Sequence, residues 1–521
     1  MGDQEVGRAS PFSVNDPDIK QLLEHNNTLS DLGSVSALLS WDQAVYMPGG
    51  AGEARSLQLA TVSVIAHEKA TNPKAGELLS KLYSRMCGGS CDFSYADTRL
   101  IRESMREYAR AVKIPSTLVE ELAVAASTGV ECWKEAKKQS DFGLFKNSLR
   151  GLVELQVERA SCLDSNTPPY DTLMDEYERG LTAAEAEKFF EPLKRELPGI
   201  VAATQNAGDS DLYDSFLRQR VKRDLLERFS CEVLAAMGFG FNTGRFDVSA
   251  HPFTTSFHPT DVRITSRYNE PSFMSSFFGA VHEGGHALYE QGIDLGLART
   301  VLGTGVSMGI HESQSRLWEN MIGRSTPFWT SWYPKLWADL LNGGHHVISE
   351  DRFVKAINMV KPGFIRVDAD EVTYNLHILV RFELEKALIS GDLSVDDVPS
   401  AWNEKMRQYL GTAPEKDSDG CLQDIHWSCG NFGYFPTYTL GNLNAAQLMA
   451  TIRKEFSDFD ERIVLGDTLF LREWLREKIH KHGCLYSPKE LMMRVTGEEL
   501  NPGYFLNYIK DKVSGLFGVS L

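Results

Sequence analysis

The residues with the clearest chemical potential lie in one short motif, His282-Glu-Gly-Gly-His286, within a helix-like segment of residues 275–292. Two histidines four positions apart on a helix differ by about 40° around its axis, so both imidazole rings can reach one ion. Glu283, beside the first histidine, can take a proton from water held at that ion. The motif predicts a hydrolytic metal site with His282 and His286 as ligands and Glu283 as general base.

A third metal ligand has to come from further along the chain, because a catalytic zinc commonly takes three protein ligands and leaves a fourth position to water. The best candidate is Glu312, which follows a glycine-rich loop (303–309) and begins a predicted helix over 312–324. A glutamate at the start of a helix also interacts favourably with the helix dipole, and the local sequence leaves that alternative open.

Two glycines separate the histidines, which is unusual inside a helix. Each costs about 1 kcal/mol of helix stability relative to alanine. Gly284 and Gly285 therefore indicate close approach by a backbone or a substrate, or tight contact with another helix.

Helices are predicted for most of the chain that must position this motif. Apolar residues recur at intervals of three to four, and Ala, Leu, Glu, Lys and Arg dominate the same segments. The periodicity starts at residue 19 and covers 53–69, 74–86, 95–112, 116–139, 141–163, 183–197, 211–237, 312–324, 326–343, 350–361, 370–390, 395–410, 444–456 and 468–481.

One region, residues 245–268, differs from the helical remainder. It is rich in β-branched and aromatic residues, partly alternates, and is interrupted by Pro252 and Pro259. This pattern predicts two or three short antiparallel strands immediately before the metal-binding helix. An exposed strand edge there could pair with an extended peptide and lay it beside the metal.

The domain organisation follows from the absence of a low-complexity linker. Residues 1–16 are polar and predict a disordered leader, and residues 17–521 predict one large helical unit. Within it we expect an N-terminal helical part over 17–110, the small sheet over 245–268, and the metal site over 270–330.

Composition excludes several classes of partner. A formal net charge of −17 argues against nucleic acid or an anionic membrane. No stretch approaches 18 apolar residues, and the N-terminus lacks the apolar segment of a secretory signal. Eight scattered cysteines form no disulfide or zinc framework, so we expect reduced thiols and a cytoplasmic location.

Six motifs in a fixed order make the metal prediction more specific. Together they resemble the carboxypeptidase Taq family of HExxH metallocarboxypeptidases, over roughly residues 20–515. The motifs are His251-Pro-Phe253, Asp261-Val-Arg-Ile-Thr265, His282-Glu-Gly-Gly-His286, His311-Glu-Ser-Gln314, Ile365-Arg-Val-Asp-Ala-Asp370 and Gly420-Cys-Leu-Gln-Asp-Ile-His-Trp427, with Trp41-Asp42 and Met47-Pro48 as further similarities.

This resemblance implies a fold, an activity and a set of site residues. The ligands of one divalent metal per chain would be His282, His286 and Glu312, with Glu283 as general base. The metal would be zinc, with cobalt as the alternative. The fold would be mainly α, with a long central cleft, partly covered by residues 17–110, and a small antiparallel sheet beside the zinc helix. The enzyme, commonly a homodimer, would release single C-terminal residues from peptides with broad specificity.

An exopeptidase must recognise the free C-terminal carboxylate, and the planar fork of an arginine suits that task. Arg366 is the first candidate, and the family resemblance implies the same residue. The alternative is an internal ion pair with Asp368 or Asp370. Arg263 is the second candidate, unless it pairs with its neighbour Asp261 and braces the sheet.

Hydrogen-bond donors for the developing oxyanion are a further requirement of peptide hydrolysis. His426, Tyr434 and Tyr438 are candidates, although a tyrosine in an aromatic-rich loop can equally belong to the core. Asp424 could orient His426 or support a metal ligand. His251 could line the cleft or serve a structural purpose.

Two alternative functions stay open on the sequence. One is a helical zinc endopeptidase or dipeptidyl carboxypeptidase with a similar zinc helix. The other is a non-catalytic helical scaffold, which the presence of all three ligands and the base disfavours.

Overall fold

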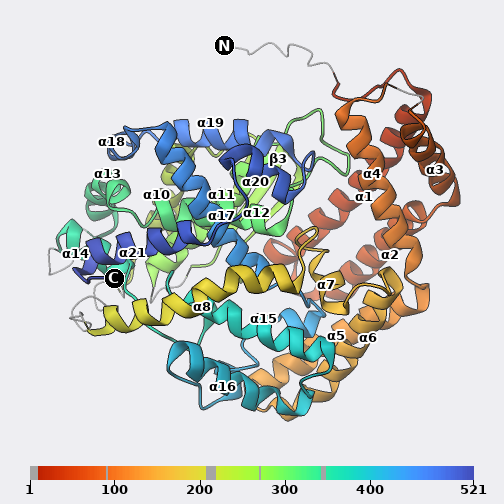
Figure 1. Cartoon of the computed structure of the whole chain (residues 1–521). Coiled ribbons are helices and arrows are strands. Elements are labelled where there is room, and N and C mark those ends of the chain that lie inside the picture. Colours follow the sequence, from red (N-terminus) through yellow and green to blue (C-terminus); the bar gives the residue numbers. More distant parts are fainter. Residues whose placement is uncertain (1–9, 90–91, 207–216, 218, 269–271, 342–347) are drawn as a thin grey trace.

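The computed structural model describes residues 10–89, 92–206, 217, 219–268, 272–341 and 348–521, which form a mainly helical molecule with one small sheet (Figure 1). The predicted fold class is confirmed. Among the described residues, none of the helices combines the length and apolar composition that crossing a bilayer requires.

The N-terminal part of the chain, up to Asn206, forms helices on one side of the molecule, coloured red to yellow in Figure 1. Most of the predicted helical ranges in this part agree with the structure to within a few residues. Their bounds are α1 Pro17–Val45, α2 Gly52–Ala70, α3 Pro73–Cys87, α4 Tyr95–Lys113, α5 Ser116–Gln139, α6 Lys146–Leu163, α7 Pro169–Met174 and α8 Ala183–Asn206.

Two predictions for this part need correction. The helix predicted over 183–197 continues to Asn206 and contains Pro192 and Pro198 in its interior. The predicted leader is ordered where it is described: Phe12 is buried, and both the backbone N–H and the hydroxyl of Ser13 donate to Asp97. Asp16 then caps the start of α1. The rest of the leader prediction, residues 1–9, lies outside the described residues.

The N-terminal helices have a hydrophobic core of their own. We call it the N-terminal core; it consists of buried side chains from α1, α3 and α4 together with Phe12 and two residues of the loop after the metal-binding helix. Those two residues are Leu297 and Leu302. The main core contains most of the remaining buried apolar side chains.

The small sheet contains β1 Gly244–Val248, β2 Phe253–His258 and β3 Asp261–Ser266 in the order β1-β3-β2. β2 and β3 are antiparallel, as predicted, but β1 runs parallel to β3. The prediction of a wholly antiparallel sheet is therefore wrong for β1, because the chain crosses the end of β3 between residues 248 and 253 instead of turning back beside β1. β2 is consequently an edge strand, and it contacts both α1 and the metal-binding helix.

The metal-binding helix is α11 (Phe273–Gly292), which lies in the middle of the molecule. It is buried around most of its circumference, as expected for a central helix with α10 (Arg223–Met237), the sheet and α12 (Met308–Arg316) on its sides. Residues 211–216 and 218 of the predicted 211–237 helix lie outside the described residues, and α10 begins at Arg223.

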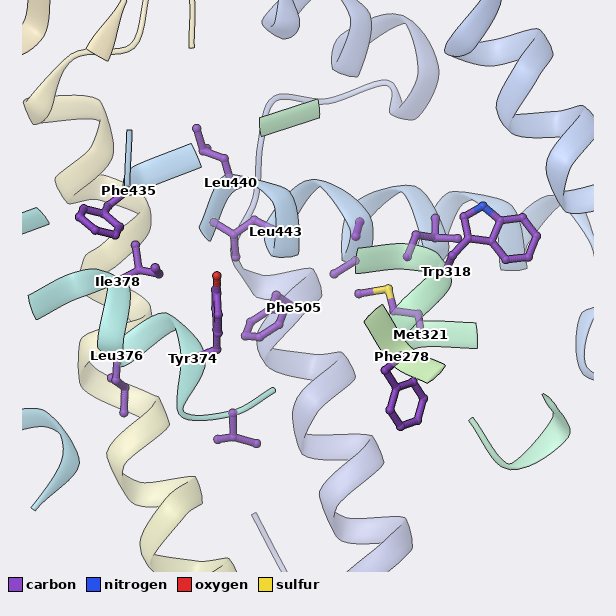
Figure 2. Close-up of a cluster of buried hydrophobic side chains, with 14 of the residues drawn as sticks. Phe278, Trp318, Met321, Tyr374, Leu376, Ile378, Phe435, Leu440, Leu443 and Phe505 are labelled. Carbon is purple, nitrogen blue, oxygen red and sulfur yellow. The ribbon is translucent and has the colours of Figure 1, made fainter. Parts of the chain in front are cut away.

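The remaining helices enclose α11 and α12 from the other side. Figure 2 shows a part of this core, which includes the side chains of Met321, Tyr374 and Phe505. The bounds of these remaining helices are η4 Leu317–Ile322 and η5 Trp337–Leu341, both π-helical, and α13 Thr326–Leu336, α14 Glu350–Ile357, α15 Tyr374–Ser390, α16 Val398–Leu410, α17 Pro436–Glu455, α18 Phe459–Val464, α19 Leu469–Lys478, α20 Pro488–Thr496 and α21 Gly503–Phe517.

Candidate metal centre and cleft

The three predicted metal ligands come together at the contact between α11 and α12. One ligand atom each of His282, His286 and Glu312 lie within 4.8 Å of one another. Glu312 Oε2 is 3.7 Å from His282 Nε2 and 3.4 Å from His286 Nε2. Ligands bonded to a tetrahedral zinc at its usual bond lengths stand about 3.4 Å apart. The side chains present therefore fit a divalent metal of that size.

Close contact between helices explains the glycines of the motif. A Cβ atom on Gly285 would lie 2.6 Å from Ser315 Cα and 2.7 Å from Gln314 O, so the backbones of α11 and α12 touch. Gly284 faces the side chain of Leu234 on α10. Both glycines thus serve helix contacts and neither faces a substrate. The contact at Gly285 is what brings Glu312 opposite the histidines.

His282 is held by a carboxylate on the π-helical turn η4. Its Nδ1 lies 2.9 Å from Glu319 Oε2, and Arg316 bonds both Glu312 and Glu319. Arg324 also reaches Glu319. A carboxylate on the outer nitrogen of a ligand histidine fixes its ring and makes it a better ligand.

Burial and charge set the protonation of the cluster. Burial would raise the pKa of Glu312, but Arg316 and His282 hold it far below the usual range of a glutamic acid. Burial alone would lower the pKa of His282. The carboxylates of Glu312 and Glu319 outweigh that effect and raise the pKa above its ordinary value. Burial lowers the pKa of His286 to about 4. Glu312 is thus a carboxylate and His286 a neutral imidazole at neutral pH, the states that bind metal.

Glu283 is buried beside the ligands and is oriented by the sheet. The hydroxyl of Thr254 on β2 donates to Glu283 Oε2 at 2.6 Å. Burial raises the pKa of the Glu283 carboxyl above its ordinary value. A carboxylate of raised pKa next to a metal position is suited to accept a proton at neutral pH.

The metal ligands form the floor of a cleft of about 830 Å³. Its lining includes residues of α4 and of the segment after α7, among them Arg106 and Tyr177, together with residues of β2 and α11. The cleft thus separates the N-terminal helices from the metal-binding helices, and its volume suits a peptide rather than a single small ion.

Tyr434 and Tyr438 line this cleft, whereas His426 does not. Their rings are 5.2 Å apart, and Tyr434 also contacts Tyr177 across the cleft. His426, in the short turn η9 (His426–Cys429), lies behind Tyr438, with its Nε2 3.2 Å from the tyrosine hydroxyl. Burial lowers the pKa of His426 to about 4, so the ring is neutral at neutral pH.

Arg366 is buried behind the cleft in the turn η6 (Arg366–Asp368). Its guanidinium group bonds Asp424 at 2.9 Å and the hydroxyl of Tyr374 at 3.0 Å. An internal ion pair was the alternative for this arginine, but the partner is Asp424, which also binds Arg381 at 2.6 Å. The ring of Tyr438 lies 4.9 Å from the guanidinium carbon, between Arg366 and the cleft.

The other two candidate substrate-binding residues do not line the cleft. Arg263 pairs with Asp261 at 2.9 Å and lies over the rings of Trp41 and Phe257. It braces the sheet against α1, as the alternative for this residue predicted. His251 is exposed, and it is the next residue, Pro252, that reaches the cleft.

Sequence reasoning missed several residues that hold the ligands or the general base, either directly or through a neighbouring side chain. Thr254, Glu290, Arg316 and Glu319 were not singled out, and His311 was noted only as part of a motif. A signal for them existed in the spacing. Positions 282, 286 and 290 share one face of α11, and positions 312, 316 and 319 share one face of the following helix.

Comparisons with known proteins agree with this geometry. The family model described as carboxypeptidase Taq (M32) metallopeptidase matches residues 21–513. Thermostable carboxypeptidase 1 of Thermus thermophilus is 40% identical over 96% of this chain and 99% of that relative. Carboxypeptidase 1 of Bacillus subtilis is 38% identical over 96% and 98%.

Solved structures show the same fold. The crystal structure of an M32 carboxypeptidase from Deinococcus radiodurans R1 has a TM-score of 0.92 and 36% identity, over 97% of this chain and all of that one. A Pyrococcus furiosus carboxypeptidase structure has a TM-score of 0.91 and 37% identity, over 96% and 99%.

Proposed function

The chain belongs to the carboxypeptidase Taq (M32) family and is a metallocarboxypeptidase, and on this premise we propose that it releases single C-terminal residues from peptides with broad specificity. The observation that carries the proposal is the convergence of His282, His286 and Glu312 on the floor of a peptide-sized cleft, with Glu283 beside them.

The proposed roles of the residues follow from their positions. His282, His286 and Glu312 would hold a divalent metal, which would supply Lewis-acid chemistry for a carbonyl group and for water. Glu283, oriented by Thr254, takes the proton from the attacking water and passes it to the leaving amine. Tyr434 and Tyr438 line the cleft, and their hydroxyls would donate to the developing oxyanion, while His426 would orient Tyr438 from behind.

Recognition of the chain end is assigned to Arg366. It belongs to a buried cluster in which two guanidinium groups, those of Arg366 and Arg381, share the single carboxylate of Asp424. This cluster therefore has an excess of positive charge behind Tyr438, which attracts a peptide carboxylate to that wall. Tyr438 has to move aside for direct contact.

The edge strand β2 is the proposed guide for the peptide backbone. Phe253, Thr254 and Ser256 line the cleft next to Glu283. An extended peptide that adds to this edge would lie along the metal position, as strand addition does elsewhere.

The metal identity, the assembly and the location are also proposals. A site with two imidazoles and one carboxylate suits zinc, and cobalt binds the same donors. All the cysteines within the described residues are free, which agrees with a reducing, cytoplasmic compartment. The proposed homodimer is tested by light scattering of the purified protein.

Mass spectrometry of a peptide mixture tests the activity. We expect a C-terminal ladder with steps of one residue, abolished by a chelator and restored by Zn²⁺ or Co²⁺. Steps of two residues, or internal cuts, would instead identify a dipeptidyl carboxypeptidase or an endopeptidase.

A matched pair of peptides tests the assignment of Arg366. The parent enzyme should cleave the free acid much faster than the C-terminal amide, and Arg366→Lys should reduce that preference because lysine lacks the bidentate fork. Arg263→Lys is the matched control. Equal cleavage of acid and amide by the parent enzyme would exclude carboxylate recognition altogether.

A further inference from the structure

The two ligand histidines are supported by different residues, and only the support of His282 is a direct carboxylate. We propose that His311 and Glu290 are positioning residues for His286: His311 accepts the outer N–H of His286, Glu290 accepts the outer N–H of His311, and the pair sets how tightly the metal is held. The proposal rests on the metal-ligand set of the proposed function. It adds to that set a relay, by which we mean the hydrogen-bonded chain from His286 through His311 to Glu290, a residue that lines the cleft.

The distances describe a continuous chain of hydrogen bonds. His286 Nδ1 lies 2.6 Å from His311 Nδ1, and His311 Nε2 lies 2.8 Å from Glu290 Oε1. The imidazole rings of His286 and His311 have centroids 4.7 Å apart. Each ring nitrogen of the two histidines thus has one partner, with Nε2 of His286 on the side of Glu312.

The protons in this chain can be assigned from the requirement for metal binding. A histidine binds metal through an unprotonated nitrogen, so Nε2 of His286 is free of hydrogen and its Nδ1 is protonated. His286 therefore donates to His311 Nδ1, which leaves the hydrogen of His311 on Nε2. That hydrogen points at Glu290, which as a carboxylate can only accept. Every donor meets an acceptor in this one arrangement.

His311 is also held in place by the loop that precedes it. A Cβ atom on Gly305 would lie 2.6 Å from His311 Cδ2, so the loop touches the ring where any larger residue would displace it. The hydroxyl of Tyr289 accepts the backbone N–H of Val306, and the Tyr289 ring lies 5.0 Å from that of His311. The ring of His311 is thus closely enclosed although His311 is not itself a metal ligand. This enclosure supports the proposal that His311 orients His286.

The comparison with His282 predicts the size of the effect. Removal of a partner on the outer nitrogen of a ligand histidine typically lowers metal affinity about 10–100-fold. His286 is supported through the ring of His311 and not directly by a carboxylate. Loss of the acceptor atom on His311 should therefore lower metal affinity more than loss of the Glu290 carboxylate.

The test measures metal affinity, which does not require activity. Zn²⁺ is titrated into metal-free protein against a competing chelator, and the visible spectrum of the Co²⁺-loaded protein reports ligand geometry. His311→Phe keeps a ring but has no acceptor, and should bind Zn²⁺ about 10–100-fold more weakly with an altered Co²⁺ spectrum. His311→Asn offers an amide oxygen near the position of Nδ1 and should recover most of the affinity.

Two further variants complete the experiment. Glu290→Leu changes a residue on the cleft wall and leaves His311 in place. It should weaken Zn²⁺ binding less than His311→Phe does. If His311→Phe fails to fold, Glu290→Leu still tests the proposal. His67→Asn, at an exposed histidine of α2, is the matched control.

Two results would count against the relay and are distinguishable from failure of the ligand set. Affinity of the His311 and Glu290 variants equal to that of His67→Asn would overturn it. A parent protein that binds no divalent metal would instead overturn the ligand set, whatever residue stands at position 311.

Discussion

The metal-ligand cluster and the cluster of Arg366, Asp424 and Arg381 both contain motif residues with little solvent exposure, but they use their charges differently. In the first, the Nε2 atoms of both histidines and one oxygen of Glu312 converge at the floor of the cleft. In the second, the carboxylate of Asp424 is taken up by the two arginines behind Tyr438. The first cluster directs its ligand atoms at one point, whereas the charges of the second cluster are largely paired with one another.

Because of this difference, we expect substitutions in the two clusters to affect different properties of the protein. Loss of a charged group from the metal cluster should change chemistry and metal binding more than folding, because a bound metal compensates the remaining charges. Loss of a charged group from the arginine cluster leaves buried charges without a partner, and should change stability first.

The largest expected effect is on activity. Glu283→Gln removes the proton acceptor but keeps the size of the side chain and an acceptor for Thr254. General bases contribute about 10²–10⁴-fold, so kcat should fall by a factor in the upper part of that range. Peptide hydrolysis and metal content are measured together.

Retention of one metal per chain in Glu283→Gln is the control for this prediction. Substantial residual turnover in a metal-loaded variant would show that another group accepts the proton.

The second effect is on the arginine cluster. Asp424→Asn leaves Arg366 and Arg381 buried side by side without a carboxylate, which should destabilise the fold by about 3–5 kcal/mol. Burial would raise the pKa of Asp424, but the two arginines hold it far below its usual range, so the charge is present at every pH of interest. Denaturant unfolding of the metal-free protein measures the change.

Asp396→Asn is the matched control, because this carboxylate is bound to Lys146 and Arg150 at the surface. Its unfolding midpoint should stay close to that of the parent. Equal midpoints for Asp424→Asn and Asp396→Asn would contradict the contrast between the two clusters.

The third effect depends on pH and concerns the start of α12. Burial raises the pKa of Glu178 to about 7, from 4.5, while its carboxylate accepts the backbone N–H of Gly309 and a hydrogen bond from Ser307. The folded state therefore holds the proton more tightly than the unfolded state. The stabilisation is complete below pH 4.5 and is lost as the pH rises through 7, a change of about 3 kcal/mol.

Glu178→Gln should remove that loss, because a neutral amide can accept from Gly309 and donate to Ser307 at every pH. The stability of the variant relative to the parent should therefore increase between pH 5 and pH 8, as measured by denaturant unfolding of metal-free protein. Glu107→Gln, at a largely exposed carboxylate, is the control. A difference that does not vary with pH would mean that Glu178 is not protonated near neutrality.

The smallest effect tests the contact between α11 and α12. Gly285→Ala sets a methyl group against the backbone of Ser315 and Gln314, so the helices must separate at a cost of about 1–3 kcal/mol, with weaker metal binding through Glu312. Gly284→Ala meets only flexible side chains, those of Leu234 and Met237, and should cost less. Equal metal affinity in both variants would show that the contact at Gly285 does not position Glu312.

The spacing of residues along the sequence was enough to predict those site residues whose relative positions are set within a single helix. His282, Glu283 and His286 follow from the turn of α11, and the helices of the N-terminal part follow from periodicity. Glu312 was the best candidate on the local sequence, but only the family resemblance favoured the ligand role over a helix-dipole interaction, since its contact with the histidines depends on a glycine on another helix.

Pairings between distant segments could not be predicted in the same way. An ion pair with Asp368 or Asp370 was the alternative considered for Arg366, but Asp370 accepts from Val372 and Thr373 in a local turn, and the partner of Arg366 lies 58 residues away. The direction of β1 likewise depends on which side of β3 the chain passes, and alternation along a strand carries no information about that choice.

The N-terminal core has a consequence for anyone who wishes to shorten this protein. Because Leu297 and Leu302 belong to that core, a fragment that starts after residue 110 would present both side chains to water directly beside the loop that encloses His311. Such a fragment would retain all three metal ligands and still lack the surface that holds their surroundings in place. The boundary suggested by chain order is therefore a poor place to divide the molecule.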